Sequence, residues 1–439
     1  MIPRRSLAAL AVLLLPAFPA LAIEIQPVTS PGGITVWLSE DHSIPMLTLE
    51  GSFRGGAALD PEGKEGAATL MSALLDEGSG DLDASAFAEA RESLATRISF
   101  DASRDDIAVS ARMLTENRDA SAELIATALT EPRFDPDAVE RVRGQLLSKL
   151  RSDETDPRAL VGRAFFDAAF PGHTYSRPTD GTIASVTALD TGDLRAAETA
   201  TLTRDRLSLA VVGDITPAEL GPLVDKIFGA LPASGPDLPP VATPALAGGI
   251  EVIDLDVPQS VVAFGVPGIP RDDPDFIPAF MMDYILGGGG ESRLNEEVRE
   301  KRGLTYGINT YLAPNDFGSL YMGHFASANA RVGEAIDIVR AEWTRMAEEG
   351  VTEAELDAAK RYVTGAYPLR FSGAENIAGQ LLRIQVAGLG LDYVNRRNGL
   401  VEEVTVADVS RVARRLLRPD LLTFVVVGRP ENVTASIND

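Results

Sequence analysis

Short stretches of alternating apolar and polar residues recur in the first half of the chain and predict β-strands. The stretches with this pattern are 34–38, 46–53, 97–102 and 106–113. Two longer stretches between them, at about 65–75 and 84–95, predict helices. Strands, then helices, then further strands indicate an α+β domain.

The second half of the chain carries a long amphipathic helix pattern. Apolar residues recur there at spacings of four and three, which is typical of a helix with one face in a core. These residues are Val332, Ile336, Val339, Trp343 and Met346. Thr352 and Glu355 follow with capping-box spacing and predict the start of the next helix.

The pattern of the first half repeats in the second half. The block DLRAAETATLTRDRLSLAVVG, residues 193–213, recurs as DVSRVARRLLRPDLLTFVVVG, residues 408–428, after a shift of 215. Residues 134–139 overlie residues 351–356 after a shift of 217, and both segments open helices. Conserved order and spacing over so much chain indicate a duplicated domain with loops of slightly different length.

A proline-rich segment separates the two copies. Residues 231–249, LPASGPDLPPVATPALAGG, hold five prolines and no sustained period, which is typical of a semi-rigid linker. We therefore predict two homologous domains, 23–230 and 250–435, each a mostly antiparallel sheet packed with helices.

The stretch 286–306, LGGGGESRLNEEVREKRGLTY, combines a glycine run with a charged helix and the start of a strand. The four glycines Gly287, Gly288, Gly289 and Gly290 allow a sharp turn or a close approach of another chain. Ser292 is expected to cap the helix and Gly303 to end it. A strand from Leu304 is then expected to place alternate residues up to Leu312 on one face.

The ends and the composition restrict the class of protein. Residues 1–22 have a basic start, a short apolar core and a small-residue cleavage site, which predicts a signal peptide and export to the periplasm. Cysteine is absent, so the fold depends on its cores rather than on disulfides. A formal net charge of −24 argues against nucleic acid and anionic lipid as partners.

A long motif within 286–306 resembles a known family. The run Gly-Gly-Gly-x-x-Ser-Arg-Leu, followed by Glu-x-x-Arg-Glu-Lys-x-Gly-Leu-x-Tyr, is similar to the second half of the pitrilysin/insulinase zinc peptidases, which include mitochondrial processing peptidase. The resemblance implies a two-domain layout. It also implies that Arg299 and Tyr306 reach toward substrate held at a zinc site of a first domain.

The zinc motif of that family is absent from this chain. Catalytic members carry His-x-x-Glu-His on the first long helix, and the resemblance aligns Thr69, Ser72 and Ala73 with these positions. Ser148 and Lys149 lie near the place of the further glutamate ligand. The three histidines form no local ligand pair, and we read them as structural: His42 in a hairpin turn, His173 in a loop and His324 on a strand. We expect this chain to bind no metal or cofactor by itself.

The resemblance therefore implies a non-catalytic subunit of a heterodimeric periplasmic zinc metalloendopeptidase. A zinc-bearing homologous subunit is the expected partner, with Arg299 and Tyr306 acting on peptide bound beside the partner's zinc. The glycine run is expected either to lie along the peptide or to form a flexible loop. The alternatives are a structural scaffold, like the core proteins of respiratory complexes, and a stand-alone peptide binder. The predicted signal peptide and the lack of an anchor count against the scaffold.

Overall fold

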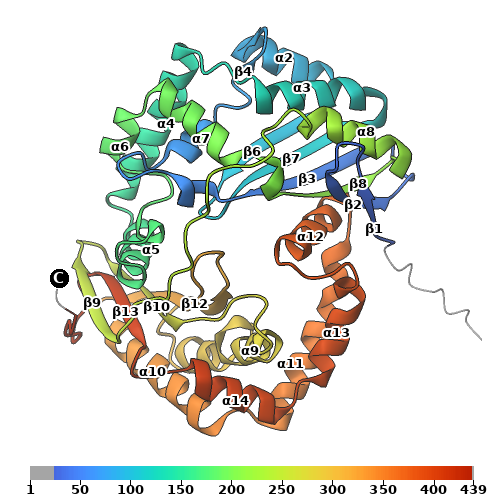
Figure 1. Cartoon of the computed structure of the whole chain (residues 1–439). Coiled ribbons are helices and arrows are strands. Elements are labelled where there is room, and N and C mark those ends of the chain that lie inside the picture. The colour runs from blue at the N-terminus through green and yellow to red at the C-terminus, as the bar shows by residue number, and fades with distance from the viewer. Residues whose placement is uncertain (1–23, 438–439) are drawn as a thin grey trace, which may run out of the picture.

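Two units, each a β-sheet packed with helices, make up the protein. The computed structural model describes residues 24–437, so the predicted signal peptide at 1–22 lies outside the described residues. Figure 1 shows the first unit, coloured blue to green, above the second unit, coloured yellow to red. The prediction of a duplicated α+β fold is confirmed.

The first unit contains a six-stranded sheet with the order β1-β2-β8-β3-β7-β6. Its strands are β1 Gln26–Thr29, β2 Thr35–Glu40, β3 Met46–Arg54, β6 Arg97–Ala102, β7 Asp106–Leu114 and β8 Leu207–Gly213. β2 and β8 run parallel, and the other neighbours are antiparallel. A short separate hairpin joins β4 Gly78–Ser79 to β5 Leu82–Asp83.

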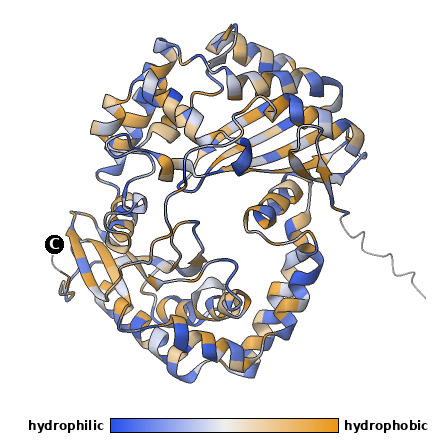
Figure 2. Cartoon of the chain, in the orientation of Figure 1, coloured by the Kyte–Doolittle hydropathy of each residue, from blue (hydrophilic) through white to orange (hydrophobic). Residues whose placement is uncertain are grey.

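The second unit repeats this topology with five strands in the order β9-β13-β10-β12-β11. Its strands are β9 Gly249–Asp254, β10 Gln259–Pro267, β11 Ile308–Ala313, β12 Leu320–Ala328 and β13 Thr423–Gly428. β9 and β13 form the parallel pair, as β2 and β8 do in the first unit. Apolar residues dominate β13, whose six residues are all buried, and they make up half of β9 (Figure 2).

Helices cover both sheets. In the first unit they are α1 Ala67–Ser72, α2 Ala84–Ser93, α3 Arg118–Thr130, α4 Pro136–Asp153, α5 Pro157–Ala169, α6 Ile183–Ala188, α7 Thr191–Thr201 and α8 Pro217–Phe228. In the second unit they are α9 Phe276–Asp283, α10 Val332–Glu349, α11 Glu353–Ala366, α12 Ala374–Val386, α13 Tyr393–Glu403 and α14 Val406–Leu416. Helices α7 and α14 match with the shift of 215 that the sequence shows. The capping box at Thr352 and Glu355 is confirmed at the start of α11.

One helix of each unit packs on the sheet of the other unit. α5 packs on β10 and β13, where Phe165 joins a cluster with Val425 and Val427. α12 packs on β8 and β3, where Leu381 joins a cluster with Trp37. Figure 1 shows α5 beside β10 and β13, and α12 beside β8. The two helices occupy equivalent positions, 217 residues apart in the chain, so the units exchange corresponding helices.

The proline-rich segment between the units contains no helix or strand between α8 and β9. It is nevertheless attached to both units, because Ala245 N–H donates to Ala169 O at 2.8 Å and Ala242 N–H to Phe317 O at 2.8 Å. Leu231 and Leu246 are buried at its two ends.

Two local predictions are wrong. The turn that holds His42 does not join a hairpin, because β8 lies between β2 and β3 and pairs with both. The strand expected from Leu304 begins four residues later, at Ile308.

Candidate functional site

A helix that covers residues 293–300 carries Arg299, which is exposed, near its end. From Asn295 to Glu300 it is a π-helix, and Lys301 N–H donates to Glu296 O at 2.9 Å. Ser292 precedes the helix as expected. Its hydroxyl, however, accepts from the side-chain amide of Asn295 at 3.1 Å, so it caps through a side chain rather than a backbone N–H. π-helical turns are uncommon and often occur at functional sites.

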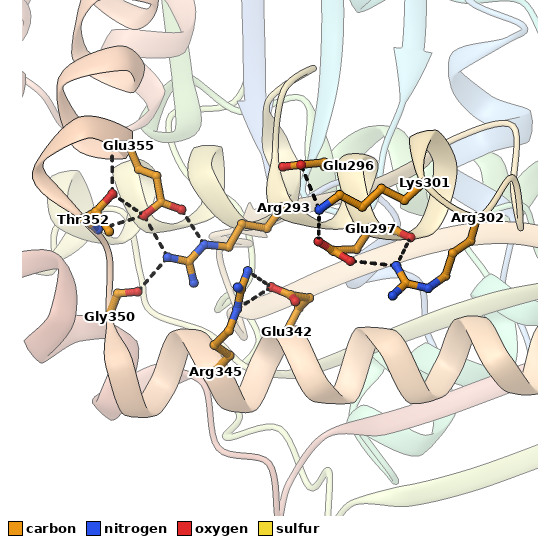
Figure 3. A network of polar contacts seen from close by, with 10 residues as sticks. All are labelled: Arg293, Glu296, Glu297, Lys301, Arg302, Glu342, Arg345, Gly350, Thr352 and Glu355. Atoms are coloured by element: carbon orange, nitrogen blue, oxygen red, sulfur yellow. Dashed lines mark hydrogen bonds and ion pairs between the residues drawn. The ribbon is translucent and has the colours of Figure 1, made fainter.

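Arg293 fixes the start of this helix. Its guanidinium donates to both carboxylate oxygens of Glu355 at 2.7 and 2.9 Å and to Gly350 O at 2.9 Å, as Figure 3 shows. Burial alone would raise the pKa of Glu355, but hydrogen bonds from Arg293 and Thr352 outweigh it and lower the pKa to about 2. A bidentate ion pair of this kind positions the helix as well as stabilising it.

The end of the helix is fixed by Glu297. Its carboxylate accepts from Lys301 at 2.6 Å and from Arg302 at 2.7 Å, and these contacts lower its pKa (Figure 3). Gly303 then ends the helix with a φ of +58°, which confirms the predicted stop. Its N–H donates to Arg299 O at 2.8 Å.

Tyr306 lies in a turn rather than in a strand. The hydroxyl of Thr305 donates to Ala326 O at 2.7 Å and accepts from Gly307 N–H at 3.2 Å, which bends the chain before β11. Tyr306 is therefore 95% exposed. The Arg299 guanidinium carbon lies 5.8 Å from the centre of the Tyr306 ring, so the structure brings the two predicted site residues together.

The first glycine of the run, Gly287, packs closely against β11. Gly287 and Gly288 end a π-helix, Tyr284–Gly288. A Cβ on Gly287 would lie 2.4 Å from Thr310 Oγ1, whereas one on Gly290 would meet nothing within 4 Å. Glycine is thus needed at the start of the run for contact with β11, and the open part of the run is confined to its end.

A buried polar chain lies beneath these glycines. Tyr321 donates to the hydroxyl of Thr310 at 3.2 Å, and Thr310 donates to Asp283 Oδ1 at 2.6 Å. Burial raises the pKa of Asp283 to about 7, against these hydrogen bonds. This carboxyl serves the packing of α9 against β11 and does not reach the surface.

A groove of about 970 Å³ opens beside Tyr306. It lies between α5 and the inner face of the second sheet. Its lining includes Arg158 and Phe166 from α5, Tyr311 from β11 and His324 from β12. The rings of Tyr311 and His324 lie 6.2 Å apart, and burial together with the charge of Arg158 lowers the pKa of His324.

The positions aligned with the zinc motif lie on α1 and are held by the protein itself. Thr69 donates its hydroxyl to Thr179 O at 3.0 Å, and Ser72, which is buried, donates to Thr69 O at 3.0 Å. Ala73 offers no donor atom. Neutral hydroxyls already engaged with backbone carbonyls do not suit zinc.

The neighbouring helix adds a positive charge to this place. Lys149 of α4 forms an ion pair with Asp180, the residue after Thr179, while Ser148 is exposed. Among residues 24–437, no three histidine, aspartate or glutamate side chains are grouped to hold a metal ion. The residues present therefore do not fit the zinc of the family.

The histidines lie apart in three different settings. His42 bonds to Asp214 at 2.7 Å and Glu40 at 3.3 Å, which raise its pKa. His173 caps a turn through Tyr175 N–H at 3.2 Å and contacts Pro240 O at 2.9 Å. Sheet packing was expected to explain His324, but its side chain is only partly buried and lines the groove. Residues that face the core alternate along β12 with residues that face the groove.

Sequence analysis missed Tyr311, His324 and Arg158 as groove residues. The same alternation that placed Thr310 and Leu312 on one face of the strand places Tyr311 on the opposite face. Arg158 could not be found in this way, because α5 reaches the groove only through the exchange of helices.

Comparison with known proteins agrees with this architecture. The family description "Insulinase (Peptidase family M16)" matches residues 35–183, and "Peptidase M16 inactive domain" matches residues 188–363. A crystal structure titled as a peptidase M16 inactive domain from Pseudomonas fluorescens superposes with a TM-score of 0.86 at 27% identity, covering 93% of this chain and 99% of that one.

Two relatives of similar identity carry different names. "Non-peptidase homolog YmxG" of Helicobacter pylori is 26% identical over 90% of this chain and 92% of its own length. "Uncharacterized zinc protease Rv2782c" of Mycobacterium tuberculosis is 27% identical over 94% of both. The names of these relatives therefore do not indicate whether this chain is itself a peptidase, and the residues at its site are the better guide. The chain belongs to the pitrilysin/insulinase family of peptidases, family M16, as an inactive member.

Proposed function

We propose that this protein is the non-catalytic, substrate-binding subunit of a heterodimeric zinc metalloendopeptidase. One observation carries the proposal. Tyr306 is almost fully exposed beside Arg299, at the rim of a large groove, on a corner whose helix is fixed at both ends. Such an arrangement suits a pair of residues that meets a ligand or a partner. The partner would be a zinc-bearing homologue, since α1 of this chain offers no ligands.

Each of the two residues has a distinct role in this proposal. The hydroxyl of Tyr306 donates a hydrogen bond to the peptide carbonyl oxygen as that oxygen gains negative charge. Arg299 donates to a neighbouring peptide carbonyl and holds the substrate in place. The guanidinium and the ring lie 5.8 Å apart, so both side chains can meet the same stretch of peptide.

The location belongs to the proposal as well. Residues 1–22 have the pattern of a signal peptide, and we place the heterodimer in the periplasm on this basis. Within residues 24–437, no helix has the length and apolar character that crossing a membrane requires.

A second candidate function rests on the groove itself. About 970 Å³ of space beside Tyr306 is formed by this chain alone, so it can bind a peptide without a partner. The stand-alone binder and the heterodimeric subunit differ in one measurable respect. Only the subunit requires a zinc-bearing homologue for any peptide cleavage.

The test is steady-state peptide cleavage by this chain mixed with a zinc-bearing homologue from the same genome. Tyr306→Phe is expected to lower kcat by about a hundredfold or more while the complex still forms, because one donor to the oxyanion is lost. Arg299→Ala is expected to raise KM as well.

Tyr362→Phe provides the matched control, because Tyr362 is also exposed but lies outside the groove lining. Size-exclusion chromatography shows whether each variant still pairs. Full activity of both site variants in an intact complex would refute the roles of Arg299 and Tyr306. Pairing without any cleavage would instead favour a structural scaffold.

A further inference from the structure

A second cavity, of about 190 Å³, lies between α9, the turn at Tyr367–Phe371, α12 and α13. Its lining contains four arginines and no carboxylate. The arginines are Arg271, Arg370, Arg383 and Arg397. In a chain with a formal net charge of −24, a cavity of purely positive charge is unusual. We call it the arginine pocket.

Two of the three aspartates that follow Arg271 are paired with other arginines, and the third, Asp272, is exposed to solvent. Asp273 and Asp275 follow Arg271 closely, but they bind Arg415 of α14 at 2.8 and 2.6 Å, and Asp275 also binds Arg411 at 2.7 Å. Among residues 24–437, no carboxylate forms an ion pair with any arginine of the pocket. The charge of Arg383 acts on the carboxyl of Glu50 in β3 and opposes the rise of its pKa on burial, so the charges without a carboxylate partner are those of Arg271, Arg370 and Arg397.

Aromatic rings hold two of these arginines in place. The guanidinium of Arg271 lies 4.1 Å from the centre of the Phe276 ring and donates to Tyr393 Oη at 2.7 Å. Arg397 lies 4.6 Å from the centre of the Tyr367 ring and donates to Val363 O at 3.0 Å. The geometry of the two charges is therefore fixed before any ligand binds.

The burial of Arg397 is costly without an anion. Only 5% of this residue is exposed, and burial together with the charge of Arg370 lowers its pKa. A buried charge is normally compensated by an opposite charge. The cost is reduced here by the rings of Tyr367 and Phe280 and by hydrogen bonds to Val363 O and Asn398 Oδ1, but no carboxylate pairs with the charge.

A second buried group points to a ligand. Tyr367 is 8% exposed, and its hydroxyl has no hydrogen-bond partner within the part of the chain that the structure describes. A buried hydroxyl without a partner destabilises the fold, so such groups are rare. An oxyanion in the pocket would accept from this hydroxyl and neutralise the arginines at the same time.

We propose that the arginine pocket binds the oxyanion group, carboxylate or phosphate, of a small molecule. The planar guanidinium fork matches both groups. A volume of about 190 Å³ suits a small acid rather than a protein segment. The site is separate from Tyr306, so the inference does not depend on the proposed function.

The test is isothermal titration calorimetry of the full mature chain with succinate and with inorganic phosphate at constant ionic strength. Saturable binding of at least one anion is expected, and the anion that binds identifies the source. Uncharged succinamide is expected not to bind. Arg370→Gln combined with Arg383→Gln is expected to raise the dissociation constant about tenfold or more, because hydrogen bonds to charged groups are lost.

Arg361→Gln is the matched control, because Arg361 is exposed on the neighbouring α11 and does not line the pocket. It is expected to bind the anion as the unchanged chain does. Tyr367→Phe keeps the ring and removes the unpartnered hydroxyl. It is expected to weaken anion binding without lowering the Tm of the anion-free protein.

Four results would overturn the proposal. They are the absence of saturable binding for both anions, equal binding of succinamide, an unchanged dissociation constant in the double variant, and an equal loss in Arg361→Gln. Circular dichroism verifies that each variant is folded. If the double variant were unfolded, Tyr367→Phe alone would decide, and unchanged binding in that variant would overturn the proposal.

Discussion

Shortening Leu381 to alanine tests whether the second unit completes the core of the first. Leu381 belongs to α12 of the second unit, is 0% exposed, and lies in one apolar cluster with Trp37, Ala210 and Val212 of the first sheet. The substitution removes apolar contact made across the two units and leaves a cavity between helix and sheet.

The expected magnitude follows from this burial. Leucine-to-alanine substitutions at fully buried sites cost about 2 to 5 kcal/mol, and we expect about 3 kcal/mol here because the helix can relax partly toward the sheet. For a cooperative unit of this size, each kcal/mol lowers Tm by about 2 to 4 °C, so a decrease of about 6 to 12 °C is expected. Leu369→Ala is the matched control. Leu369 is 75% exposed, so a change within about 0.5 kcal/mol is expected.

The chain offers a direct assay, because it contains two tryptophans and each reports on one unit. Trp37 lies in the first sheet, and Trp343 is buried in the core of the second unit. Trp343→Phe leaves fluorescence from Trp37 alone, and guanidinium unfolding then follows the first unit. Leu381→Ala in this background is expected to lower the midpoint that Trp37 reports, although residue 381 belongs to the other unit.

The reasoning would be refuted if Leu381→Ala left the Trp37 transition unchanged. The reciprocal background, Trp37→Phe, leaves fluorescence from Trp343 alone. The reasoning would also be refuted if Leu381→Ala lowered the unfolding midpoint reported by Trp343 and not the one reported by Trp37. Either result would show that α12 stabilises its own unit alone. If Leu381→Ala changed the dependence of the unfolding free energy on guanidinium concentration but not the midpoint, the effect would lie in the unfolded state and not in the exchanged helix.

Three further predictions concern the site. Metal analysis after dialysis is expected to show no stoichiometric zinc in the isolated chain, and tightly held zinc that is lost together with activity would contradict this. Restoring histidine, glutamate and histidine on α1 is not expected to create an efficient enzyme, since Lys149 remains beside the site. The pKa of Asp283 is raised from 3.8 to about 7, so the stability that its protonated form contributes below about pH 4 is lost as the pH rises to about 7. Asp283→Asn is therefore expected to flatten the pH dependence of the free energy of unfolding, and an unchanged profile from pH 4 to 8 would count against this. Gly287→Ala is expected to cost about 1 to 3 kcal/mol by overpacking against Thr310, whereas Gly290→Ala is expected to be nearly neutral, and equal effects would show that the run is not packed.

Local patterns predicted much of the fold. The strands 97–102 and 106–113, the capping box at Thr352 and the stop at Gly303 all depend on neighbouring residues, and each is present where expected. The repeat in the sequence is also present in the topology, since β9-β13-β10-β12-β11 of the second sheet corresponds to β2-β8-β3-β7-β6 of the first.

The remaining features depend on contacts between distant residues. Tyr306 follows the alternation of a strand, but the turn held by Thr305 and Ala326 removes it from the sheet. The arginine pocket joins residues from 271 to 397, and no spacing rule connects them. The exchange of α5 and α12 is equally invisible, because an amphipathic helix does not reveal which sheet its apolar face will cover.

The exchange of helices has a consequence for the order in which this protein can be completed during synthesis. The last strand of the first sheet, β8, ends at Gly213, but the helix that covers Trp37 and Val212 is not finished until Val386. At about 5 to 20 residues per second, the ribosome needs roughly 10 to 35 s to make the intervening segment. For that time one apolar face of a fully translated sheet stays open to other proteins. We therefore expect either that a chaperone binds the first half during synthesis or that the first half folds only after α12 has been made.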